Sequence, residues 1–331
     1  MKRILTAILL ASFLLGLCAC GVSKTPATTQ ETTAPIEQPV LRVLTLGHSL
    51  ALDSGHMLAL IAAKEGGLNL KLGTLYYSGC TLQQHVEFMD SDSPKYNLYV
   101  SSTEESYKPP ERIEAVTMRQ AIEYEQWDVV VMQGGATEIA RNEPFTNGNI
   151  QRIQAFVDAH KQNPDVVFAW HMPWAPPTDA DLLSKYPYAD NPYISTYQAF
   201  DNDRSKLYGA ITQCVADNIL TDETFKFLIP TGTAIENALS SYLEEKELHR
   251  DYIHASDLGR VIAAYTWYCK LAGVSQLEEL KLDMVPWFFL LNNESAEDFV
   301  LTDNQKTVVL EAVNNALDQP LKLTPSQFTE G

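Results

Sequence analysis

Short apolar runs alternate with stretches of helical periodicity along most of the chain. Five runs, brief and rich in β-branched or other apolar residues, predict buried strands at 40–46, 69–76, 128–133, 166–170 and 225–230. Apolar residues spaced three and four apart predict helices over 55–65, 81–89, 115–124, 150–161, 199–217, 233–243, 256–271 and 305–316. Strands that alternate with helices indicate an α/β fold with a doubly wound, mostly parallel sheet.

Two segments break this alternation. Residues 90–112 are irregular apart from Tyr96, Leu98 and Val100, whose period of two predicts a hairpin strand. Residues 171–197 are rich in Pro and Tyr and show little periodicity. An ordered surface loop of that length is usually functional, so we expect it to border a binding site or to act as a lid.

The first residues have the pattern of an export signal. Lys2 and Arg3 precede an apolar run, 4–17, that is too short to span a bilayer. The run ends in Leu-Cys-Ala-Cys-Gly, which resembles the lipobox of bacterial lipoproteins, with Cys20 as the lipidated residue. An ordinary signal peptide with incidental cysteines is the alternative. We therefore expect a signal peptide over 1–19 and a membrane-anchored lipoprotein on the extracytoplasmic side of a bacterial cell.

The segment after Cys20 is rich in Thr, Pro, Ala and Gln up to residue 39. Such a composition cannot bury enough apolar surface to fold, so it predicts a disordered tether over 20–39. The folded domain would then occupy 40–331, and its contact with the membrane would run only through the lipid anchor.

Composition narrows the possible functions further. The chain has 331 residues, of which 45% are hydrophobic, which is enough for a large core. Lys and Arg number 24 against 42 Asp and Glu, a net charge of −18 that argues against nucleic-acid binding. Cys214 and Cys269 lie in apolar helical patterns and are expected to be buried free thiols. No Cys-x-x-Cys or His/Cys cluster suggests a metal site.

Residues that could carry chemistry follow the predicted strands. The carboxyl ends of parallel strands form the binding edge of such a sheet, and Ser49 follows the first strand there. A serine hydroxyl becomes a nucleophile only when a base takes its proton. His254 is a candidate base, and Asp251, three residues earlier, could orient its imidazole. Alternatively, Ser49 could merely cap the following helix.

The order of these segments resembles the four blocks of SGNH (GDSL-type) hydrolases. Ser follows the first strand, Gly the second and Gly-x-x-Glu the third, and Asp-x-x-His comes near the end. The words at 46–49, 77–80 and 229–232 are most similar to one branch, the DUF4886 domain, and the resemblance covers about 40–275. It implies a flavodoxin-like three-layer α/β/α sandwich and ester hydrolysis without metal or cofactor.

The resemblance also implies roles for single residues. Ser49 corresponds to the nucleophile, His254 to the base and Asp251 to its partner. The backbone N–H groups of Ser49 and Gly79 correspond to two donors of the oxyanion hole, the group that binds the negative oxygen of the intermediate.

The third oxyanion donor of the family, an Asn side chain, has no match. Gap-free alignment of 128–138 places Gly135 on the family's Gly and Thr137 on its Asn. Gln133, at the end of the strand, is an alternative donor. Without the family's Asn, we expect a slower reaction of the same type.

The sequence says less about the substrate than about the reaction. Aromatic side chains with polar tips suit sugar rings or acyl groups, and the loops hold many of them. The residues expected to contact substrate are His48, Trp170, His171 and Trp174. His249 is expected at the surface. The sequence thus favours an esterase that removes acyl groups, with acetyl groups expected first, from carbohydrate or another small ester. A non-catalytic glycan-binding lipoprotein is the alternative.

Overall fold

The structure is a computed structural model that describes residues 38–142, 145, 147–290 and 296–330. From Gln38 onward the chain forms one compact unit. The predicted signal peptide, the lipidated Cys20 and nearly all of the tether lie outside the described residues and stay predictions. Within the described residues, no helix combines the length and apolar character needed to cross a bilayer.

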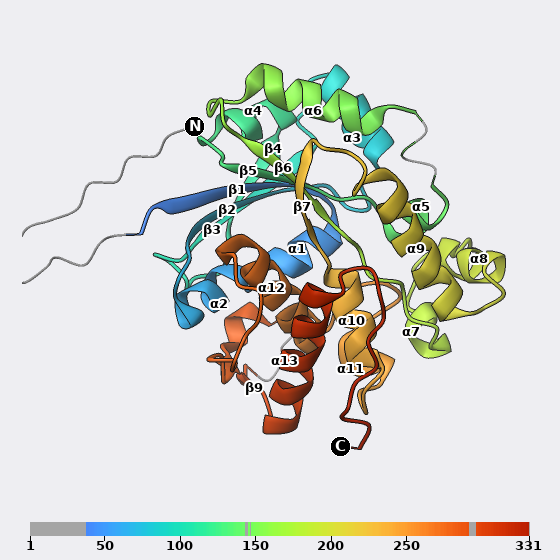
Figure 1. The fold of residues 1–331 in the computed structure, drawn as a ribbon. Coiled ribbons are helices and arrows are strands. Elements are labelled where there is room, and N and C mark those ends of the chain that lie inside the picture. Colours follow the sequence, from blue (N-terminus) through green and yellow to red (C-terminus); the bar gives the residue numbers. More distant parts are fainter. Residues whose placement is uncertain (1–37, 143–144, 146, 291–295, 331) are drawn as a thin grey trace, which may run out of the picture. The chain divides into compact units, whose positions relative to one another are not determined.

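A seven-stranded sheet runs through the centre of this unit (Figure 1). Its order is β4-β3-β2-β1-β5-β6-β7. The strands are β1 (Val40–Gly47), β2 (Asn69–Tyr76), β3 (Tyr96–Ser102), β4 (Glu111–Val116), β5 (Val129–Met132), β6 (Val167–His171) and β7 (Phe225–Ile229). β1 pairs in parallel with β2 and β5, and β6 and β7 continue the parallel pairing. β3 and β4 run antiparallel at one edge. The mostly parallel sheet is confirmed.

Helices cover both faces of the sheet, as Figure 1 shows. One layer contains α3 (Leu82–Asp90), α4 (Met118–Glu123) and α6 (Asn149–His160). The other contains α1 (Ser49–Gly55), α2 (Leu58–Glu65), α10 (Thr231–Leu239), α12 (Asp257–Ala272) and α13 (Asp303–Asp318). The remaining helices in the described residues are α5 (Ala136–Ala140), α7 (Ala180–Ser184), α8 (Pro192–Ala199), α9 (Arg204–Asn218), α11 (Glu245–Leu248) and the 3₁₀ helix η2 (Trp287–Phe289). A second, two-stranded sheet pairs β8 (Met284–Val285) with β9 (Phe299–Val300). The three-layer α/β/α fold is confirmed.

The apolar runs form strands because both of their faces are covered. All four residues of β5 are buried, and so are the last five of β1. A strand buried on both faces has no polar side to alternate with, which explains its continuous apolar sequence. Cys214 and Cys269 are buried free thiols, as expected, and Cys80 is a third.

Three elements differ from the prediction. The first helix begins at Ser49 rather than at residue 55, because the His48 side chain caps it by accepting a hydrogen bond from Leu50 N at 3.3 Å. β4 was not expected, since its charged side chains lie at the exposed edge of the sheet. The segment 171–197 contains α7 and the start of α8, the latter marked by Asn191 as cap and Pro192 in its first turn.

Candidate active site

Five segments of the sequence line one pocket of about 390 Å³. Three follow the parallel strands β1, β2 and β5, the fourth is 186–193, and the fifth is the loop before α12. The lining residues are His48, Ser49, Leu50, Ser78, Gly79, Cys80, Thr81, Gly135, Ala136, Thr137, Glu138, Tyr186, Tyr188, Pro192, Tyr193, Tyr252, Ile253 and His254. The pocket lies where a parallel sheet binds its ligands, beyond the carboxyl ends of its strands.

Ser49 stands at the junction between β1 and α1. It is the first residue of the helix, and His48 before it is the cap. The capping role considered for Ser49 therefore belongs to His48, which leaves the Ser49 hydroxyl at the pocket wall. The first N–H groups of a helix have no partner within the helix. The backbone N–H of Ser49 is thus available to a ligand in the pocket.

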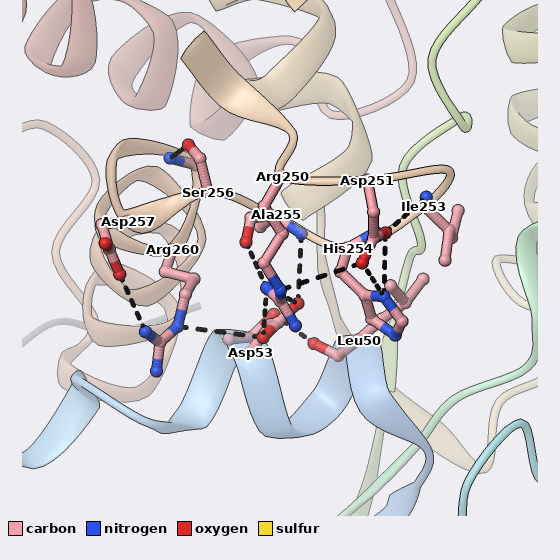
Figure 2. Close-up of polar contacts among 12 residues, drawn as sticks. Leu50, Asp53, Arg250, Asp251, Ile253, His254, Ala255, Ser256, Asp257 and Arg260 are labelled. Carbon is pink, nitrogen blue, oxygen red and sulfur yellow. Dashed lines mark hydrogen bonds and ion pairs between the residues drawn. The ribbon is translucent and has the colours of Figure 1, made fainter. Parts of the chain in front are cut away.

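His254 is held by Asp251 within one short loop. Its Nδ1 lies 2.9 Å from both carboxylate oxygens of Asp251. Asp251 Oδ1 also accepts hydrogen bonds from the backbone N–H of Ile253 at 3.1 Å and of His254 at 2.9 Å (Figure 2). Burial raises the pKa of the Asp251 carboxyl, but the hydrogen bond and charge of His254 outweigh it and lower that pKa to about 2. An ionised Asp251 fixes the proton on Nδ1 and leaves Nε2 as an acceptor.

The predicted nucleophile and base, unlike His254 and Asp251, are not hydrogen-bonded to each other. Ser49 and His254 line the same pocket, yet no hydrogen bond joins their side chains. Such contacts are often long in unliganded enzymes and tighten around substrate. The structure therefore brings the three predicted catalytic residues to one site and joins two of them.

The predicted oxyanion groups are only partly assembled. Gly79 lies in the turn after β2 with φ +59, a left-handed conformation that favours glycine. Its backbone N–H donates to no described residue, and a Cβ added at this position would meet no atom within 4 Å. Thr137 lies in α5 and lines the pocket, and Gly135 N donates to Glu138 at 3.0 Å. Gly79 and Thr137 thus border the same space as Ser49.

Gln133 was wrong as an oxyanion donor. Its side chain is fully buried, lies outside the pocket lining, and places Nε2 2.5 Å from His171 Nδ1. The prediction failed because Gln133 lies beside β1 and is enclosed by the sheet and its covering helices. A donor committed to a buried imidazole cannot also reach the pocket.

Three of the four predicted substrate contacts were also wrong. Trp170, His171 and Trp174 are each 0% exposed, so none of them can touch a ligand in the pocket. Trp174 Nε1 instead donates to Ile253 O at 2.7 Å, and the His171 ring contacts Trp267. Trp170 packs against Phe145 and Phe225. His48 does line the pocket.

The comparisons with known proteins agree with this fold. The family model "Domain of unknown function (DUF4886)" matches residues 42–285. This chain belongs to the DUF4886 family. The crystal structure of a DUF4886 family protein from Bacteroides uniformis ATCC 8492 is 22% identical, with a TM-score of 0.67 over 87% of this chain and 98% of that one. It shows the same fold.

More distant structures share less of the fold. A putative SGNH hydrolase from Slackia heliotrinireducens is 16% identical, with a TM-score of 0.41 over 70% of this chain and 98% of that one. A family 3 carbohydrate esterase from Clostridium thermocellum is 10% identical, with a TM-score of 0.39 over 70% and 94%. No curated protein matches the chain.

Burial keeps several histidines of this DUF4886 chain neutral at pH 7. Burial lowers the pKa of His48 to about 4, and those of His56, His85 and His249 to about 3. His249 is 1% exposed, so its expected place at the surface was wrong. A histidine with so low a pKa is neutral at pH 7, which excludes His48 as a cation that binds an anionic substrate.

One aromatic residue at the DUF4886 site, Tyr252, was not predicted from the sequence. Tyr252 lies between Asp251 and His254 in the chain and places its ring 5.4 Å from the His254 ring. It also contacts Tyr186 and Tyr193, which belong to the segment 171–197. The aromatic content of that segment was visible in the sequence, but its contact with Tyr252 was not.

Other candidate chemistry in the pocket is weak. Burial raises the pKa of the Cys80 thiol, so Cys80 stays protonated and is a poor nucleophile. Across the part of the chain that the structure describes, no group of three or more His, Cys, Asp or Glu side chains is placed to hold a metal ion.

Proposed function

We propose that this protein is a serine hydrolase of the SGNH type that removes small acyl groups from esters of carbohydrate. One observation carries the proposal: Ser49 and His254 line the same pocket, and Asp251 holds His254 Nδ1 at 2.9 Å. That arrangement leaves His254 Nε2 as a base on the side of the imidazole away from Asp251.

The reaction would proceed in two halves. His254 Nε2 takes the Ser49 proton as the oxygen attacks the ester carbonyl, and the imidazolium then protonates the leaving alcohol. A water molecule, deprotonated by His254, attacks the acyl-Ser49 ester, and the acid leaves as the Ser49 hydroxyl is restored. Asp251 stays ionised throughout and stabilises the imidazolium.

The negative oxygen of each intermediate needs donors already in place. The backbone N–H groups of Ser49 and Gly79 supply two in this proposal. With Gln133 buried, the Thr137 hydroxyl is the remaining candidate for the third. A hydroxyl on a short side chain is expected to bind the oxygen less well than the amide of the family's Asn.

Four tyrosines suit a carbohydrate as the alcohol part of the substrate. Tyr186 contacts the rings of Tyr188, Tyr193 and Tyr252, and all four line the pocket. Tyr188 is 70% exposed, which leaves its ring free to stack against a sugar. The pocket volume, about 390 Å³, is of the size that holds one small ligand.

Ester hydrolysis by the chain from Gln38 onward tests the proposal. Acetate release from an acetylated methyl glycoside and labelling by a fluorophosphonate probe are expected for the unmodified protein and absent in Ser49→Ala. Ser91→Ala, which removes an exposed serine outside the pocket, is the matched control and should behave as the unmodified protein. Full activity in a folded Ser49→Ala variant would refute the proposal.

Two observations favour a second candidate, a non-catalytic glycan-binding protein. The family's Asn is replaced by Thr137, and Ser49 is not hydrogen-bonded to His254. Under this alternative the fluorophosphonate probe leaves Ser49 unlabelled, while sugars bind measurably and binding weakens in Tyr188→Ala.

A further inference from the structure

A buried carboxylate connects the helix of Ser49 to the loop of His254 (Figure 2). Asp53 lies on α1, one turn after Ser49, and its side chain is 4% exposed. Both of its oxygens accept hydrogen bonds from Arg250 Nη1 at 3.0 Å. Asp53 Oδ2 also accepts from Ala255 N at 3.1 Å. One side chain therefore holds the loop at two points five residues apart.

Those two points enclose the predicted base and its partner. Asp251 and His254 both lie between Arg250 and Ala255 in the chain. Figure 2 shows them on the part of the loop beside these two residues. The backbone closes the same loop, because Arg250 N donates to His254 O at 3.0 Å. Any movement of Arg250 or Ala255 relative to α1 would thus carry His254 away from Ser49 or toward it.

Asp53 belongs to a network of charged side chains. Arg260 Nε lies 3.8 Å from Asp53 Oδ1, and Arg260 Nη1 lies 3.0 Å from Asp257 Oδ1. Arg250 Nε also lies 4.0 Å from Asp251 Oδ2, so the two arginines face three aspartates. Asp53 and Arg260 are almost wholly buried. Removing a buried charge leaves its partners uncompensated, which typically costs about 3–5 kcal/mol. Asp53 is consequently a poor site for a first test, since its variants could fail to fold.

We propose that Asp53 and Arg250 are positioning residues that set the location of His254 relative to Ser49. The inference rests on the proposed function, because the position of His254 matters only if His254 acts on Ser49. We call the contacts of Asp53 with Arg250 and Ala255 the Asp53 clamp. Arg250 is the better probe: its side chain is 26% exposed, and without it Asp53 still has Ala255 N and the charge of Arg260 as partners. Its loss should release one end of the loop while leaving the fold intact.

Arg250→Gln, Arg250→Lys and the unmodified protein are compared in ester hydrolysis and in the rate of fluorophosphonate labelling. A displacement of the base by about 1 Å can lower a rate by about 100-fold. We therefore expect kcat and the labelling rate to fall about 100-fold in Arg250→Gln, with KM little changed. Arg250→Lys keeps a charged donor for Asp53 and should recover part of the loss.

The control separates positioning from general stability. Tyr265→Phe removes a buried hydrogen bond to Glu65 at 2.6 Å, and Tyr265 lies outside the pocket lining. It should lower Tm while kcat and labelling stay as in the unmodified protein. Equal losses of kcat in Tyr265→Phe and Arg250→Gln at a matched fall in Tm would overturn the inference, as would normal labelling of Arg250→Gln. An unmodified protein without activity would instead refute the proposed function, and the inference with it.

Discussion

Replacing Asp251 by Asn tests the proton arrangement at the site. Asp251 Oδ1 accepts from two backbone N–H groups, at 3.1 and 2.9 Å. An Asn has a single acceptor oxygen, so that oxygen must take the place of Oδ1. The NH₂ group then replaces Oδ2, which lies 2.9 Å from His254 Nδ1. Two donors cannot face each other there. The remaining oxygen also lies 2.9 Å from Nδ1, but its two lone pairs already accept the two backbone N–H groups. We therefore expect the imidazole to move its proton to Nε2 and to accept from the NH₂ group at Nδ1.

The wrong tautomer removes the base before the reaction starts. In a serine protease the equivalent change lowers kcat about 10⁴-fold, and we expect a loss of that order here. Folding should suffer far less. The pKa of Asp251 falls from 3.8 to about 2, and its side chain is 22% exposed. At pH 7 that shift corresponds to about 2 kcal/mol of stability, or a fall in Tm of about 3 °C for a folded unit of this length.

The assay compares Asp251→Asn with Asp251→Ala in acetate release and fluorophosphonate labelling, well below both Tm values. Alanine imposes no tautomer, because water can serve both the backbone N–H groups and Nδ1. Asn, although the smaller change in shape, should therefore lower the rate at least as much as Ala. Activity of Asp251→Asn within tenfold of the unmodified protein would refute this account of His254.

Three further predictions follow from the structure. Thr137→Val keeps the shape and removes the hydroxyl, so kcat should fall about 100-fold, and an unchanged kcat would show that Thr137 binds no oxyanion. Gly259→Ala should lower the unfolding free energy by about 3 kcal/mol in a denaturant titration, because its Cβ would clash with the backbone oxygen of Leu248. A normal midpoint would contradict this contact. The buried histidines have pKa values of about 3–4 when folded and about 6.5 when unfolded, so the unfolded state binds more protons between those values. Stability should be complete above pH 6.5 and fall as the pH drops toward 4, and a flat Tm between pH 7 and 4.5 would contradict the burial of these groups.

Periodicity was enough to predict the sheet and most of its helices. The strand over 69–76 has the predicted limits, and β1, β5, β6 and β7 lie within a residue or two of theirs. β5 and most of β1 are buried on both faces, so their apolar sequences directly indicate buried strands. β4 was not predicted, because most of its side chains are exposed and its sequence resembles that of a loop.

The candidate site also contains residues that the sequence predicted and residues that it did not. Ser49, Gly79 and His254 follow recognisable blocks and do line one pocket. Trp174 was misplaced because an aromatic residue after a strand can point into a pocket or beneath it, and sequence does not distinguish the two. Asp53 and Arg250 were missed for another reason: each resembles an ordinary surface charge until the fold brings them together.

The clamp on Asp53 also determines when the site can exist. Its two partners follow it by 197 and 202 residues, so the carboxylate has neither of them until more than half of the chain has emerged from the ribosome. A nascent chain or a fragment that ends before Arg250 contains Ser49 but not His254. Activity should therefore appear only with the completed tertiary structure, which makes ester turnover a sensitive reporter of correct maturation.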